Sequence, residues 1–218
     1  MFDILSLYIA LIPLSIYLLV MGLVNLSRRP FVVSGVRDLG VLCLAATGFI
    51  VVGPMELFFP VEASFRFGSY VWLLLLAIFF LLIVLLLLAQ RPRINIYNIS
   101  LSDLRPILSD LAMELDPTAR WAGDSLAMPK KGVQFYLEPT PALKNVSLVA
   151  YKKEQNLESW RILENSLRRG LRHVKSSHRR TVGMALFLTG LIMFILLNGM
   201  VWFYLEAFLA AIPNMLRM

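Results

Sequence analysis

A dense group of basic residues precedes the last apolar segment of the chain. Arg161, Arg168 and Arg172 recur at helical spacing, on the face opposite an apolar stripe. The whole group comprises Arg161, Arg168, Arg169, Arg172, Lys175, Arg179 and Arg180. Basic residues beside a membrane span attract anionic lipid headgroups by about 1 kcal/mol each. The positive-inside bias of membrane proteins produces the same cluster, so charge that only sets topology is the simpler interpretation of the two.

The residue types that perform catalysis or bind metals form no such pattern. His173 and His178 are the only histidines, and their five-residue offset places them on different helix faces, with no ligand partner at metal-site spacing. Asp124-Ser125 lies at a predicted turn, where these residues occur for backbone reasons. The sequence lacks a phosphate loop and a nucleophile elbow. We therefore predict no catalytic residue, no metal site and no cofactor, and we expect the chain not to be an enzyme.

Polar and small residues are sparse inside the apolar segments. Gly183, Gly190 and Asn198 fall on roughly one face of the last segment, a pattern typical of close helix packing. Glu56 follows Gly53-Pro54, which predicts a kink near the outer interface. It could be a coupling carboxylate in a transporter, although contact with interfacial water is the simpler interpretation. These residues motivate an alternative function as a transporter or channel subunit.

Four apolar segments can cross a bilayer. Hydrophobic residues make up 58% of the chain and charged residues 16%, which indicates a membrane protein. A spanning helix needs about 20 apolar residues. Segments that meet this length lie at about residues 4–26, 39–59, 69–89 and 182–205, and Asp38 is placed to cap the second. The single cysteine allows no disulfide within the chain.

The distribution of Lys and Arg predicts the orientation. Arg28, Arg29 and Arg37 lie in the first loop, and the other basic clusters flank the segment between the third and fourth spans. After four crossings all these clusters lie on one side, which the positive-inside rule assigns to the cytoplasm. Both termini are then outside. The fold class is a membrane all-α protein, N-out and C-out, with one inserted domain.

The insert, residues 91–180, is patterned as a small α+β domain. It carries 16 Lys and Arg against 9 Asp and Glu, and so accounts for the net charge of +7. Helical periodicity runs from Leu104 to Leu115 and again from Leu157 to Val174, and Gly123-Asp124 predicts a hairpin turn. The order β-α-β-β-β-α indicates an antiparallel sheet covered on one face by two helices. Residues 1–90 hold three spans, and residues 181–218 hold the fourth span and a short external tail.

These features lead to a functional hypothesis. We expect a multi-pass membrane protein whose cytoplasmic domain is a non-enzymatic binding or assembly module. Its partner would be another protein, anionic lipid headgroups or a second copy, and not nucleic acid, because a basic groove with stacking aromatic residues is missing. The alternatives are a transporter or channel subunit and a membrane-bound enzyme. The expected location is the cell membrane; a bacterial inner membrane is an assumption suggested by the compact loops alone.

Overall fold

The computed structural model describes residues 4–55, 66–68, 70–141, 144–152, 155–174, 180–206 and 208–209. Four helices in this part of the chain are long and apolar enough to cross a membrane. They are α1 (Ile4–Leu26), α2 (Gly35–Ile50), which continues into a π-helical segment (Val51–Met55), α4 (Tyr70–Ala89) and α7 (Arg180–Phe203). The four apolar segments of the sequence are therefore helical over their described residues, while residues 56–59 of the second segment and Ser69 of the third lie outside the described part of the chain.

The second of these helices differs from its predicted form. It begins at Gly35, four residues before the predicted start at residue 39, so Asp38 lies within its first turn and is not its capping residue. The π-helical segment contains Gly53-Pro54, where a kink is predicted. Because proline has no N–H group, it cannot continue the regular hydrogen-bond ladder, and a wider turn accommodates it.

The chain divides into two compact units. One comprises residues 1–22, 40–88 and 185–218, and the other comprises residues 23–39 together with 89–184. In the first unit, α1 and α7 approach closely at glycines: a Cβ atom added at Gly22 would lie 2.6 Å from the Phe187 nitrogen, and one at Gly190 would lie 2.8 Å from the Leu19 nitrogen. Side chains larger than hydrogen therefore do not fit at these two positions.

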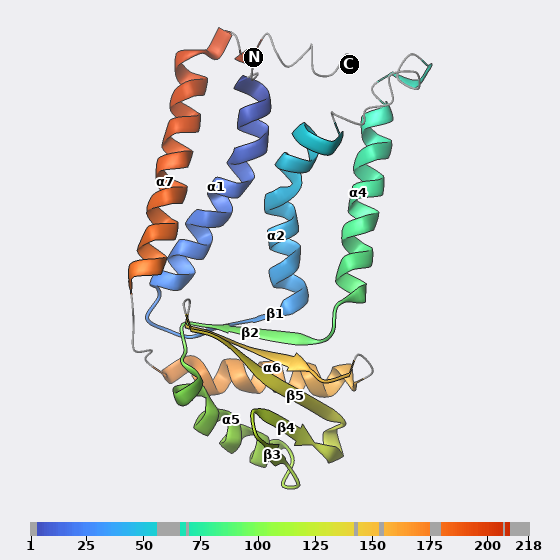
Figure 1. Cartoon of the computed structure of the whole chain (residues 1–218), viewed down its shortest axis with the longest axis vertical. Coiled ribbons are helices and arrows are strands. Elements are labelled where there is room, and N and C mark those ends of the chain that lie inside the picture. The colour runs from blue at the N-terminus through green and yellow to red at the C-terminus, as the bar shows by residue number, and fades with distance from the viewer. Residues whose placement is uncertain are drawn as a thin grey trace. The chain divides into compact units, whose positions relative to one another are not determined.

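The second unit is built on a six-stranded antiparallel sheet (Figure 1). Its strands, in spatial order, are β1 (Phe31–Ser34), β2 (Arg93–Tyr97), β6 (Asn145–Ala150), β5 (Val133–Thr140), β4 (Ser125–Met128) and β3 (Arg120–Ala122). Two α-helices, α5 (Leu101–Leu115) and α6 (Leu157–Gly170), pack with it. A short 3₁₀ helix at Pro129–Lys131 follows β4, and another at Leu171–His173 follows α6.

Sheet and helices enclose one hydrophobic core. The inward side chains of the strands alternate with polar ones, as Val133, Phe135 and Leu137 do on β5. They meet the apolar stripes of α5 and α6, where Leu108 and Leu163 are completely buried. The predicted antiparallel sheet with helices on one face is therefore present. Ser100 caps α5 and Asn156 caps α6, each accepting backbone N–H groups with its side-chain oxygen.

The strand order departs from the predicted β-α-β-β-β-α in two respects. Between α5 and α6 there are four strands, because the two arms of the Gly123-Asp124 hairpin are separate strands. In addition, the first loop, between α1 and α2, contributes β1, which pairs antiparallel with β2. Val32 of β1 is 5% exposed and belongs to the same core. The sheet is therefore not confined to residues 91–180.

Candidate functional site

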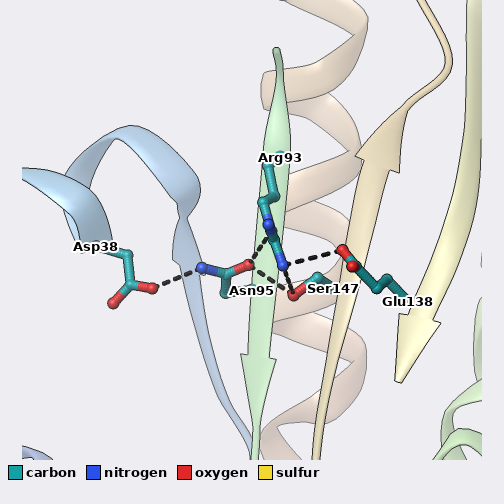
Figure 2. Close-up of polar contacts among 5 residues, drawn as sticks. All are labelled: Asp38, Arg93, Asn95, Glu138 and Ser147. Atoms are coloured by element: carbon teal, nitrogen blue, oxygen red, sulfur yellow. Dashed lines mark hydrogen bonds and ion pairs between the residues drawn. The ribbon is translucent and has the colours of Figure 1, made fainter. Parts of the chain in front are cut away.

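A line of polar side chains crosses the sheet on its outer face, opposite the core. In β2, Ile94 and Ile96 point into the core, while the alternate residues Arg93, Asn95 and Tyr97 point the other way. Figure 2 shows that the side chains of this face form a chain from Asp38, in the first turn of α2, across β2 to β6 and β5. We call this set, Asp38, Arg93, Asn95, Tyr97, Glu138 and Ser147, the outer-face network.

Asp38 is the acceptor at one end of the network. Its carboxylate accepts a hydrogen bond from the Asn95 side-chain amide at 2.6 Å and from the Tyr97 hydroxyl at 2.8 Å. Tyr97 is 7% exposed, so its hydroxyl needs a partner within the protein. Hydrogen bonds to an ionised acceptor contribute about 1.5–3 kcal/mol, roughly twice a neutral one. Asp38 therefore ties the start of α2 to β2.

Arg93 occupies the other end of the network. Its guanidinium donates to the Asn95 side-chain oxygen and to the Ser147 hydroxyl, both at 2.9 Å, and lies 3.2 Å from the Glu138 carboxylate. The Ser147 hydroxyl in turn donates to the Asn95 oxygen at 2.8 Å. The network thus contains two carboxylates, one guanidinium and three neutral side chains, those of Asn95, Tyr97 and Ser147. The members use one another as hydrogen-bond partners. The role of the network is therefore structural: it holds the start of α2 and the strands β2, β6 and β5 together.

A second polar contact holds the end of α1. Asn98 follows β2, has a left-handed backbone with φ of 61°, and is 5% exposed. Its side-chain amide donates to the Val24 carbonyl oxygen at 2.6 Å, and its backbone N–H donates to the Asn145 side-chain oxygen at 3.4 Å. Asparagine tolerates the left-handed region better than most residues. The Val24 carbonyl, in the last turn of α1, also accepts the Ser27 N–H at 3.2 Å, so the sheet supplies a second hydrogen bond to this helix end.

Asp116 organises the turn that follows α5. Its carboxylate accepts the hydroxyl and N–H of Thr118, at 2.6 and 2.8 Å, and the N–H of Lys130 at 2.9 Å. Burial opposes ionisation, but the hydrogen bonds from Thr118 and Lys130, with the positive charge of Lys130, outweigh it and hold the pKa of Asp116 below its ordinary value. The residue thus joins the end of α5 to the 3₁₀ turn after β4.

The predicted basic cluster lies partly within the described residues. Arg161, Arg168, Arg169 and Arg172 are all exposed, and Arg168 forms an ion pair of 2.8 Å with Glu164 one turn earlier. Arg169 donates to the Ser166 hydroxyl at 3.4 Å. Lys175 and Arg179 lie outside the described residues, and of Arg180 only its place at the start of α7 is described.

The three residues predicted to mediate helix packing have different surroundings. A Cβ atom added at Gly183 would lie 2.9 Å from the Asn25 carbonyl carbon, and Gly190 approaches Leu19 as described above. Asn198 is exposed, and its amide donates to the Phe194 carbonyl of the same helix at 2.8 Å. Glu56, the predicted coupling carboxylate, lies outside the described residues.

Other predicted residues are accounted for locally. His173 is exposed at the end of the 3₁₀ turn, and His178 lies outside the described residues. Asp124 sits in the hairpin turn and forms an ion pair of 3.3 Å with Arg105. Within the described residues no group of three or more His, Cys, Asp or Glu side chains is placed to hold a metal ion.

The outer-face network is not recognisable from the sequence. The alternation of Arg93, Asn95 and Tyr97 with isoleucines is visible and indicates that one strand face is polar. What the polar face contacts is not visible, because Asp38 and Asn95 are 57 positions apart. Likewise Asn98 and Asn145 each begin an Asn-x-Ser sequence, the acceptor pattern for N-glycosylation. On the predicted topology these residues are cytoplasmic and are not expected to be glycosylated, so the pattern does not point to the hydrogen bonds that they form.

Comparison of the chain with protein-family models, with curated protein sequences and with solved structures finds no match.

Proposed function

We propose that this chain is a multi-pass cell-membrane protein whose α+β domain faces the cytoplasm and serves as a non-enzymatic binding and assembly module. One observation carries the proposal: all four bilayer-length helices run into the domain within a few residues. Residues 27–30 connect α1 to β1, and β1 leads directly into α2. Residues 90–92 connect α4 to β2, and residues 174–179 connect the last 3₁₀ turn to α7. A domain that is connected to every one of these helices is suited to organising the helices in the membrane.

This connectivity supports the proposed topology. If one domain holds the end of α1, the start of α2, the end of α4 and the start of α7, successive helices must cross in opposite directions. Exposed arginines accompany these attachment points: Arg28 and Arg29 after α1, Arg37 in α2 and Arg91 after α4. Positive charge in short connections favours the cytoplasmic side. Both features support the proposal that the domain faces the cytoplasm.

The exposed face of α6 is the proposed contact surface. Leu157, 65% exposed, lies on the same helical face as Arg161 and Arg168. Arginine is enriched in protein interfaces, where its apolar stem and its planar charged group both contribute. A protein partner with an acidic surface fits this combination best. Anionic headgroups or a second copy of the chain are the other occupants that the test must distinguish.

Photocrosslinking in native membranes tests the contact surface. The full chain carries p-benzoylphenylalanine in place of Arg161 or, as a control, in place of Met113, which is 58% exposed on α5. We expect one discrete protein adduct from position 161 and none from position 113. An adduct with the mass of a second copy would identify self-assembly, and lipid adducts alone would contradict a protein partner. Equal adducts at both positions, or none at all, would refute the proposal.

Cysteine labelling tests the orientation. Cys43 is first replaced by alanine, and Lys152, which is exposed in the domain, is replaced by cysteine. A membrane-impermeant maleimide should label Lys152→Cys only after the cells are permeabilised. Labelling in intact cells would place the domain outside and overturn the cytoplasmic assignment, while leaving the photocrosslinking result interpretable.

The transport alternative has less support. It depends on Glu56, which lies outside the described residues, and on Asn198, whose amide is used by its own helix.

A further inference from the structure

An open groove lies where α1 ends and β1 begins. Its volume is about 330 Å³, and its lining consists of Leu23, Val24, Ser27, Arg29, Pro30 and Phe31. All six residues belong to the same compact unit. Neither the basic cluster of α6 nor the outer-face network contributes to it.

The lining combines an apolar wall with a polar end. Leu23 and Phe31 are 57% and 48% exposed, although both side chains are large and apolar. Arg29 is also exposed, and among the described residues no carboxylate forms an ion pair with it. The Ser27 hydroxyl accepts the backbone N–H of Arg29 at 3.3 Å, which brings the hydroxyl and the arginine together. An anion with an apolar tail would match both parts.

The groove is held open by contacts with the sheet. The Val24 carbonyl is bound by the Asn98 amide at 2.6 Å, which fixes the last turn of α1. Phe31 pairs with Tyr97 in the β1–β2 ladder, and their rings lie 6.5 Å apart. Because the binding surface is formed before a ligand arrives, little ordering is required on binding.

The position of the groove along the chain indicates which anion it meets. α1 has 23 residues and is long and apolar enough to cross a membrane, so its last turn and the residues after it lie near the boundary between hydrocarbon and headgroups. We propose that this groove binds one acidic phospholipid. The phosphodiester contacts Arg29 and Ser27, and an acyl chain lies along Leu23 and Phe31.

A free anion fits the groove less well than a lipid. Inorganic phosphate would use only Arg29 and Ser27, and it would make no contact with the apolar wall. Arginine binds phosphate through two parallel N–H groups, and the buried apolar surface of the acyl chain adds to that affinity. The proposal needs only that α1 spans the membrane, so it stands apart from the partner proposed for α6.

Arg28 provides a matched control. It carries the same charge, is also exposed and lies one residue before Arg29, but it does not line the groove. If the two arginines only attract the membrane surface or set the topology, their replacement by alanine should have equal effects. If the groove binds a lipid, only the replacement of Arg29 should weaken that binding.

Native mass spectrometry of the purified full chain measures the binding. The protein is titrated in detergent with phosphatidylglycerol or with phosphatidylcholine of the same acyl chains, and the first bound lipid is quantified. We expect phosphatidylglycerol to bind more tightly. Since a basic residue near anionic lipid contributes about 1 kcal/mol, Arg29→Ala should weaken phosphatidylglycerol about fivefold, and Arg28→Ala less than about twofold. Equal losses in the two variants, or no loss with Arg29→Ala, would overturn the proposal.

A second variant separates lipid from free anion. Leu23→Ser removes part of the exposed apolar wall without changing the charge, and it should weaken both lipids. Inorganic phosphate should compete with phosphatidylglycerol only at concentrations far above those of the lipid. If phosphate displaces the lipid at equal concentration, or if Leu23→Ser binds like the wild type, the groove does not recognise a phospholipid. Far-UV circular dichroism confirms that each variant is folded before its binding is interpreted.

Discussion

The Asp38 carboxylate accepts a hydrogen bond of 2.6 Å from the side-chain amide of Asn95, a residue 57 positions away. Asp38 lies in the first turn of a bilayer-length helix, and Asn95 lies on the second strand of the sheet. The bond therefore joins the start of α2 to β2 beyond the covalent connection through β1. Movement of the sheet against this turn would break a charge-assisted hydrogen bond.

Removing the carboxylate should destabilise this junction. Asp38→Ala removes the hydrogen bonds from the Asn95 amide and from the Tyr97 hydroxyl to the carboxylate, so we expect the free energy of unfolding to fall by about 2 kcal/mol. Denaturant unfolding of the full chain in detergent measures the change. Arg37→Ala, at the exposed neighbouring position, should change stability by less than about 0.5 kcal/mol. Additive effects of Asp38→Ala and Asn95→Ala in a double-mutant cycle would show that the two residues are not coupled.

The first loop should be necessary for the domain to fold. A fragment of residues 91–174 lacks β1, so β2 becomes an unpaired edge and the core loses Val32. We expect this fragment to aggregate or to unfold without a cooperative transition, because exposed apolar edge strands associate. Adding residues 29–35 through a Gly/Ser linker should restore a cooperative thermal transition by circular dichroism. The same addition carrying Val32→Asp should not restore the cooperative transition. If it does restore the transition, β1 contributes no specific packing to the core.

The approach of α1 to α7 should tolerate no side chain at Gly190. A Cβ atom there would lie 2.8 Å from the Leu19 nitrogen, whereas at Gly199, in the same helix, nothing lies within 4 Å. Alanine is favoured over glycine in a helix by about 1 kcal/mol, so Gly199→Ala should leave stability unchanged or raise it. Gly190→Ala should lower the thermal unfolding temperature in detergent. If both variants behave alike, the close contact is not maintained in the protein.

Asp116 should make the stability of the domain depend on pH. Because its pKa in the folded protein is lowered, its contribution is fully present above the unfolded-state pKa, about 3.9 for an aspartate, and is lost as the pH falls through the folded-state value. Asp116→Asn removes the negative charge and places an amide N–H₂ group where the carboxylate oxygen accepts the Lys130 N–H, so two donors face each other. The variant should therefore be less stable near neutral pH, and the difference from wild type should shrink on acidification below about pH 4.

Thermal unfolding between pH 3 and pH 7 measures this effect. Asp110→Asn, the same change at an exposed position on α5, controls for the loss of one negative charge. A difference between Asp116→Asn and wild type that stays constant over this range would show that the ionised carboxylate does not hold the turn together.

Local features of the sequence determined the helices and most of the strands. The apolar run of α4 needs no tertiary partner to be recognised, since hydrocarbon itself requires about 20 apolar residues with internally satisfied backbone groups. The stripe of α6 and the alternation of β5 are equally local, as is the hairpin turn at Gly123-Asp124. Each of these signals is complete within one segment of the chain.

Only the tertiary structure decided that Phe31–Ser34 (β1) joins the sheet as an edge strand, and that Asp38 belongs to the outer-face network. Four residues are too few to show a period. A strand is stable only through hydrogen bonds to its neighbour, and here the paired residues Ser34 and Ile94 are already 60 positions apart. The groove at the end of α1 depends on the same pairing, because Phe31 takes its position from Tyr97. Partners of this kind are set by three-dimensional proximity, which composition and periodicity do not encode.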